Sequence, residues 1–306
     1  MWLLFAFISS SIVGVRDTLK KQSLVGNDLF VVLMLNILLM VLFFGCLMGI
    51  SHGTDWLGGT FLYIPPVSGG VVLRCLPLAA MTLGVWFFGY MGFKHLPLSI
   101  AGIINAMGPI MVVVGAAFVY GEQLNATQVA GVAVSVISMV TLSRSGSQEG
   151  IRFSHNRWIW AMLLSAVFSA SAALYDKYLM GRVEDGGLGM DVMMVQCWIS
   201  ILQLPAACLL VWLRHRRFAH SGGLPFRFRW SIVWVSICQC LADVLYCAAL
   251  QMPGAMVSML AMIRRGSVII SFCLGVWIFH EVGVRRKLFD LLLVIVGMVL
   301  LYIGSR

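Results

Sequence analysis

The sequence predicts an all-α integral membrane protein of ten transmembrane helices, arranged as two inverted five-helix repeats. Sixty per cent of its residues are apolar, the mean hydropathy is +0.96, and only 11% are charged, which is not the balance of a water-soluble surface. The apolar residues fall into ten runs, most of them close to the ~20 residues that cross a bilayer as helix. Features of the first half also recur 159 residues later in the second half.

The expected spans are bounded by breaks at Lys, Arg, Gly and Pro. They lie near residues 2–20, 28–50, 71–93, 97–119, 124–142, 158–179, 190–213, 230–250, 254–279 and 286–304. The first run has no basic segment before it, so we expect a retained helix rather than a cleaved signal peptide. The domains are expected to be a first repeat at 1–143, a basic connecting loop at 144–157 and a second repeat at 158–306. Because most connections are short, no soluble catalytic module is expected.

The two halves carry matching acidic residues. Asp17 and Asp176 are 159 residues apart, and so are Glu122 and Glu281, each of which ends an apolar run. An odd number of crossings in each copy would place the second copy upside down relative to the first. Inverted repeats with a site at their midplane interface are typical of secondary transporters.

The basic residues behind the net charge of +9 are distributed along the chain in a way that predicts membrane topology. Lys and Arg fall mainly in alternate connections, including 20–21, 214–217, 227–229 and 285–287, which predicts that these connections are cytoplasmic and that both termini lie on the other side. A bacterial inner (plasma) membrane is the expected location. The expected partners are a small-molecule substrate and the lipid bilayer, with a homodimer as one option and no nucleic acid.

Arg264 and Arg265 stand midway along the ninth span, where one arginine costs about 2.5–3.5 kcal/mol. Asp243 in the eighth span should differ from Arg264 in depth by only ~5 Å, because a tight turn joins the two spans. Neighbouring helical residues diverge by about 100°, so both arginines cannot face Asp243. We expect one to pair with Asp243 and the other to receive an anionic group in a central cavity. The alternative is that both serve only packing and ion pairing.

Other polar and aromatic residues are expected around the same cavity. Asn105 aligns with Arg264 at the repeat offset, and Tyr90 and Tyr246 each precede a proline by seven residues. Trp86 lies one helical turn before Tyr90 on the same face. Core packing is the alternative for the aromatic residues. The expected substrate-binding residues are Arg264, Arg265, Asn105, Trp86, Tyr90 and Tyr246.

Asp243, Asp17 and Asp176 are expected to form ion pairs or to couple transport to protons. Asp17 and Asp176 lie near span ends, where Arg16 and Lys177 are neighbours that would pair with them. An aspartate tied to arginine stays ionised and is a poor proton carrier near neutral pH. Such a site would suit facilitated diffusion or exchange, whereas an unpaired Asp243 would suit proton antiport.

The stretch Gly92-Phe93-Lys94-His95-Leu96-Pro97-Leu98-Ser99, followed by Asn105, Pro109, Gly121-Glu122 and Gly131, resembles the EamA-type domain of the drug/metabolite transporter superfamily. The second half repeats the pattern more weakly at Pro253, His280-Glu281 and Gly297, with Asp290 in the place of Gly131. The resemblance covers essentially the whole chain. It implies a ten-helix carrier of metabolites, amino acids, nucleotide sugars or sugar phosphates. It also implies that spans one, three, four, six, eight and nine surround the cavity, with spans five and ten outside.

The expected function is therefore secondary transport of a small anionic or zwitterionic metabolite by alternating access. A lipid-phosphate flippase or headgroup carrier would use the same arginines but needs a lateral opening to the bilayer. An intramembrane aspartyl protease is suggested only superficially, by Tyr175-Asp176 and the later Asp191, which flank a loop. No cofactor or metal is expected, because no Cys-x-x-Cys or Cys/His ligand spacing occurs.

Overall fold

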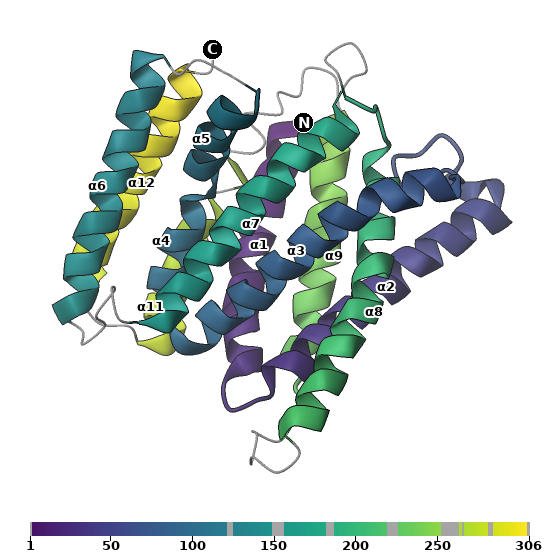
Figure 1. Ribbon diagram of the computed structural model, residues 1–306, viewed down its shortest axis with the longest axis horizontal. Coiled ribbons are helices and arrows are strands. Elements are labelled where there is room, and N and C mark those ends of the chain that lie inside the picture. The colour runs from purple at the N-terminus through teal and green to yellow at the C-terminus, as the bar shows by residue number, and fades with distance from the viewer. Residues whose placement is uncertain are drawn as a thin grey trace.

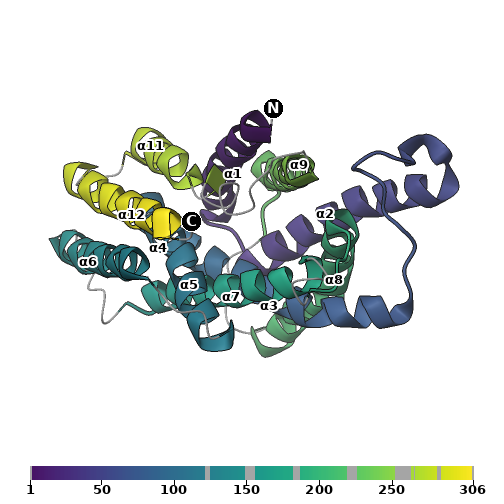
Figure 2. The same cartoon turned by 90° about the horizontal axis from the view of Figure 1, so that it is seen from above.

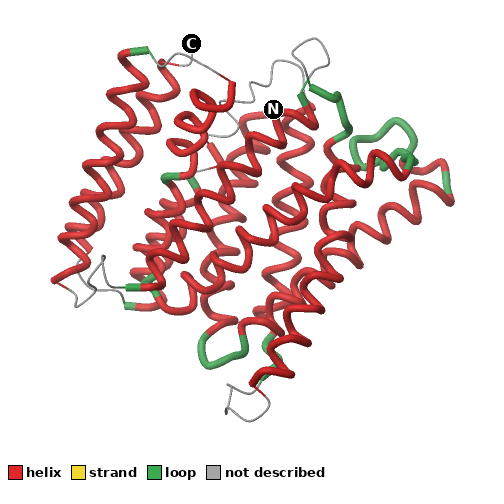
Figure 3. Tube along the Cα trace, viewed as in Figure 1, coloured by secondary structure: helices red, strands yellow, loops and turns green. Residues whose placement is uncertain are grey.

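The computed structural model describes residues 2–120, 125–148, 156–181, 187–218, 226–251, 263–264, 266–280 and 284–304, which are helices and connections without a strand (Figures 1 and 3). The helices are α1 (Trp2–Leu24), α2 (Leu29–Gly53), η1 (Asp55–Leu57), α3 (Gly69–His95), α4 (Leu98–Ala106), α5 (Gly108–Tyr120), α6 (Ala126–Gln148), α7 (Arg157–Met180), α8 (Val192–Phe218), α9 (Trp230–Gln251), α11 (Ser267–Phe279) and α12 (Val284–Gly304). The expected all-α class is confirmed.

Seven of the described helices are long and apolar enough to cross a membrane: α1, α2, α3, α7, α8, α9 and α12. Three shorter apolar stretches, Leu98–Val112, Ala126–Ser138 and Ser267–Phe279, lie within the expected fourth, fifth and ninth spans but cover only part of each. The chain is thus compatible with a multi-pass membrane protein.

The expected fourth span, 97–119, is not one helix. Helix α4 ends at Ala106 and α5 begins at Gly108, with Met107 between them. Pro109 explains the break, because proline has no backbone N–H to donate to the carbonyl of Asn105. The kink expected at Pro109 is therefore a division into two short helices. Of the expected ninth span, only α11 and residues 263–264 and 266 are described.

Helices pack in pairs that combine the two halves of the chain. Helix α1 lies against α9, α2 against α8, α3 against α7, α4 against α11 and α6 against α12 (Figures 1 and 2). The main core surrounds α4, whose Leu98, Ile100 and Ile103 are fully buried. The α6–α12 pair stands at one edge of the bundle (Figure 1).

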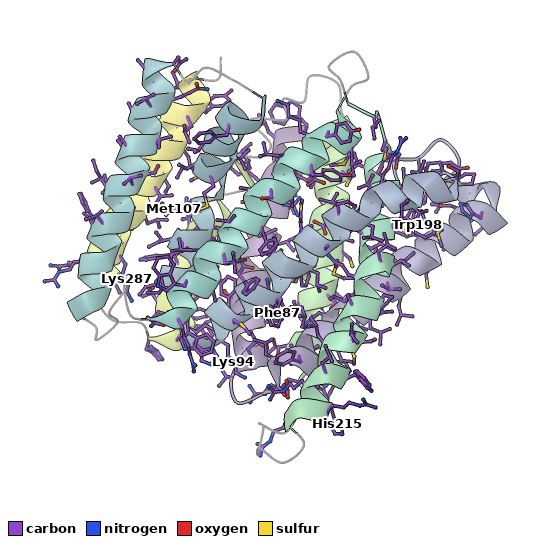
Figure 4. The ribbon with its side chains drawn as sticks, in the orientation of Figure 1. Phe87, Lys94, Met107, Trp198, His215 and Lys287 are labelled. Carbon is purple, nitrogen blue, oxygen red and sulfur yellow. The ribbon has the colours of Figure 1, made fainter. Side chains whose placement is uncertain are left out.

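Both chain ends lie at the top of the bundle in Figure 1. Lys94 and His215 mark its opposite end (Figure 4), which we call the basic end because the Lys- and Arg-rich connections gather there. Two helices run further than expected. Helix α1 continues past residue 20 to Leu24, and α6 continues to Gln148, so the connecting loop expected from residue 144 begins inside a helix.

Candidate functional site

A line of hydrogen-bonded polar side chains crosses the interface between α1 and α9. Asp17 Oδ1 accepts hydrogen bonds from Arg16 Nε (3.0 Å) and Nη2 (2.6 Å). Arg16 Nη1 donates to Gln239 Oε1, and Gln239 Nε2 donates to Asp243 Oδ2 (2.6 Å). Asp243 Oδ1 accepts from Arg264 Nη2. The line therefore connects two charged clusters that lie at different depths in the bundle.

Helical spacing explains how neighbouring members of this line meet on each helix. Gln239 and Asp243 are four residues apart on α9, so they share a face, and Asp17 and Lys20 are three apart on α1. The two helices are joined in this line by the hydrogen bond from Arg16 to Gln239, whereas Lys20 faces the aromatic residues of α3. Because hydrocarbon offers no water to solvate these groups, each must find its partners within the protein.

The ion pair expected between Arg264 and Asp243 is present. Arg264 also stacks on Tyr246, with its Cζ 4.5 Å from the ring centroid. Gln196 Nε2 donates to Asp243 Oδ2 (3.1 Å). Asp243 is thus held by three donors, which is not the unpaired arrangement that would suit proton antiport. The side chain of Arg264 keeps 28% of its surface exposed, against 7% for Asp243.

Lys20 belongs to the site, although the sequence placed it in a basic loop. It is only 7% exposed, and its Nζ lies 3.7 Å from Asp17 Oδ1. Its Nζ also lies 5.2, 4.9 and 5.2 Å from the ring centroids of Trp86, Tyr90 and Phe93. Trp86 and Tyr90 stack on each other at 5.8 Å, as their shared face predicted. These distances are those of cation–π interactions.

The remaining expected site residues are less connected. Asn105 is half-buried on α4, and its side chain forms no hydrogen bond with a described residue. Asp176 is half-buried on α7 and forms no ion pair within the described part of the chain. Arg265 lies outside the described residues. Asp191 caps α8 by accepting from Met194 N (3.0 Å).

The structure thus assembles two clusters from the expected residues. Asp17, Trp86 and Tyr90 meet around Lys20, and Asp243 and Tyr246 meet around Arg264. Arg16 and Gln239 join the clusters, and no sequence signal marked Gln239, because a neutral amide within an apolar run is unremarkable on its own.

Two apolar grooves lie on the outside of the bundle. One, of about 500 Å³, is formed by α2 and α9 around Phe43 and Ile237, and the other, of about 470 Å³, by α3 and α8 around Leu83 and Pro205. Neither is lined by the charged residues above. The central cavity expected around Arg264 stays a prediction.

Comparison with known proteins supports the fold only. No family model matches the sequence, and no curated protein matches it. Solved structures do match, 28 chains in all. One of them, described as "Crystal structure of protein", aligns over 100% of this chain and 98% of its own, at 17% identity and a TM-score of 0.58. Both chains therefore share one fold over their whole length, while the resemblance to the EamA-type domain stays a prediction.

Proposed function

We propose that the protein is a secondary transporter, not an enzyme, that moves a small anionic or zwitterionic metabolite by alternating access. The observation that carries this proposal is the line of polar side chains from Lys20 to Arg264 within an apolar helix bundle. One such charge costs about 2.5–3.5 kcal/mol at the centre of a membrane helix, and charges kept there generally mark a path for substrate or ions.

The packing supports two inverted five-helix repeats. In the proposed repeat α1 corresponds to α7, α2 to α8 and α3 to α9. Exchanging each helix for its counterpart turns the α1–α9 contact into α7–α3 and the α2–α9 contact into α8–α3, and all four contacts occur. Helices α5 and α11 both have 13 residues, and both of their ends are 159 residues apart. Helix α1 runs towards the basic end and α7 away from it (Figure 1). Two such bundles can rock against each other around a site at their interface.

The proposed substrate site lies around Arg264. Asp243 holds the guanidinium of Arg264, so Arg265 is the arginine that the sequence hypothesis leaves for the anion, and the exposed part of Arg264 would add a second contact to the same carboxylate or phosphate. Tyr246 contributes an aromatic face. Arg265 and Asn105 remain proposed contacts, and Trp86 and Tyr90 would contact the apolar part of the substrate. We also propose EamA-type membership and a bacterial inner-membrane location, on the sequence resemblance and the Lys/Arg bias.

Transport by purified protein tests the proposal. Amino acids, organic acids and sugar phosphates are first screened for thermal stabilisation, since a ligand that binds the native state raises its melting temperature. Compounds that stabilise are then followed by counterflow in liposomes. We expect counterflow with the wild type and its loss in Arg264→Gln. Arg216→Gln is the matched control, because Arg216 stacks on Trp212 of its own helix. The proposal fails if no stabilising compound is transported or if Arg264→Gln transports normally.

A lipid-phosphate carrier is the second candidate. The two apolar grooves lie between helix pairs on the outside of the bundle, where acyl chains can enter. Such a carrier would move a fluorescent phosphatidic acid between the leaflets of the same liposomes. Arg264-dependent movement of this lipid, without counterflow of any soluble compound, would favour this candidate.

A further inference from the structure

Positive charge exceeds negative charge in the cluster around Lys20. Arg16 and Lys20 share the single carboxylate of Asp17, and both approach the same oxygen, Oδ1. Gln239 offers Arg16 only a neutral oxygen. Arg264, in contrast, has the carboxylate of Asp243. An unmatched charge is costly in a buried site, so the cluster around Lys20 is the better place for an added anion.

The hydroxyl of Tyr90 is a second, independent sign of a ligand. Tyr90 is fully buried, and its hydroxyl has no hydrogen-bond partner in the described part of the chain. Lys20 stands over its ring, with Nζ 4.9 Å from the ring centroid. A buried polar group without a hydrogen-bond partner destabilises the folded state. An anion oxygen beside Lys20 would accept the missing hydrogen bond.

We propose that Lys20 and the Tyr90 hydroxyl form a second anion-binding position, near the basic end, for a carboxylate or phosphate group. Trp86 and Phe93 complete its wall and exclude water. This inference rests on the proposed transport function and adds a binding position to it.

The geometry separates the two positions in depth. Tyr90 lies five residues before the end of α3, and Tyr246 lies five before the end of α9. These helices end at opposite faces of the bundle (Figure 1). Through the Arg16–Gln239 contact, the helical rise between Lys20 and Tyr246 is about 16 Å. Each half therefore supplies one tyrosine whose ring contacts a cation, and the line of hydrogen-bonded side chains connects these two cation–tyrosine pairs.

Thermal unfolding of the purified protein with inorganic phosphate, and separately with acetate, tests the second position. We expect at least one anion to raise the melting temperature of the wild type. Lys20→Met should weaken the response about tenfold or more, the scale of one lost charge-assisted bond. Lys20→Arg should retain it. Lys21→Met, which removes the neighbouring cation outside the aromatic cluster, is the matched control and should respond like the wild type.

Tyr90→Phe separates ligand binding from packing. Removing a hydroxyl that has no partner should leave the ligand-free melting temperature unchanged or raise it. The same substitution should weaken the response to the anion several-fold. If Lys20→Met does not fold, as judged by size-exclusion chromatography, the anion responses of Lys20→Arg and Tyr90→Phe still test the second position.

Several results would overturn the second position: no response of the wild type to either anion, a normal response of Lys20→Met, loss of the response in Lys20→Arg, or a ligand-free Tyr90→Phe that unfolds earlier. Counterflow that depends on Arg264 would still support the transporter in each case. A Lys20-dependent response to short-chain phosphatidic acid, as well as to phosphate, would add a lipid headgroup as a source of the same anion. A response to the lipid alone would overturn a position for soluble anions.

Discussion

Asp243 shows how one carboxylate is held within this apolar bundle. It accepts hydrogen bonds from Gln239 of its own helix, from Gln196 of α8 and from Arg264. Two amides and one guanidinium thus replace the water that the carboxylate would bind outside the protein. Because the partners come from different segments, the loss of this one charge affects all of them.

Asp243→Asn should lower the melting temperature clearly. Removing one member of a buried ion pair costs about 3–5 kcal/mol, and the cost should be smaller here because Arg264 is 28% exposed. The double variant Asp243→Asn/Arg264→Gln should recover part of the loss, because it leaves no unpaired charge. A double-mutant cycle from thermal unfolding in detergent measures this coupling. Simple additivity of the two single variants would show that the pair contributes no coupling.

The contrast between Arg264 and Lys20 shows what sequence can reveal at this scale. The Arg264–Asp243 pair was predictable, because the sequence predicts a short connection between their spans and helical rise then gives their depths. Lys20 was not, because the Lys/Arg rule assigns a lysine at a span end to a loop. Its burial depends on α1 continuing to Leu24 and on the aromatic residues of α3 that meet it there, and both are tertiary features.

At the scale of elements, the sequence marks the place where one expected helix is interrupted. Pro109 was a visible signal for the interruption between α4 and α5, although the extent of the interruption was not predictable from one residue.

The α6–α12 contact depends on two glycines. A Cβ on Gly131 would lie 2.9 Å from the carbonyl oxygen of Gly297 and 3.0 Å from the backbone nitrogen of Leu301. Since backbone atoms cannot rotate away, only glycine permits this approach.

Gly131→Ala should therefore destabilise the α6–α12 pair. The helices must separate by some tenths of an ångström, which loses packing along their contact, so we expect a lower melting temperature. Gly49→Ala on α2 is the control, because a Cβ there would meet nothing within 4 Å and alanine favours a helix over glycine by up to about 1 kcal/mol. Equal melting temperatures of the two variants would contradict the importance of this contact.

At the scale of the whole molecule, polar contacts between the halves close the basic end. Asn27 is fully buried in the turn after α1. Its Oδ1 accepts from the backbone nitrogen of Arg227 (2.9 Å), and its Nδ2 donates to the carbonyl oxygen of Arg227 (2.7 Å). Asp28 pairs with Arg214 of α8 at 3.0 Å. These contacts join the start of the first half to the end of α8 and the approach to α9. Sequence patterns located the basic end but not these bonds, since they depend on how the two halves meet.

If the halves rock during transport, the contacts of Asn27 and Asp28 must break when the basic end opens. The double variant Asn27→Ala/Asp28→Asn should favour that open state, and asparagine at position 28 keeps an oxygen for the cap of α2. Ser23 is fully buried one turn before Asn27, so a Ser23→Cys substitution reports access. We expect a water-soluble maleimide to label this cysteine several-fold faster in the double variant, after subtraction of labelling in the same protein with Ser23. Arg216→Gln, which removes a cation at the same end, should not change the rate. Unchanged labelling in the double variant would mean that these contacts do not control opening, and the closure of the basic end would then have to depend on apolar packing alone.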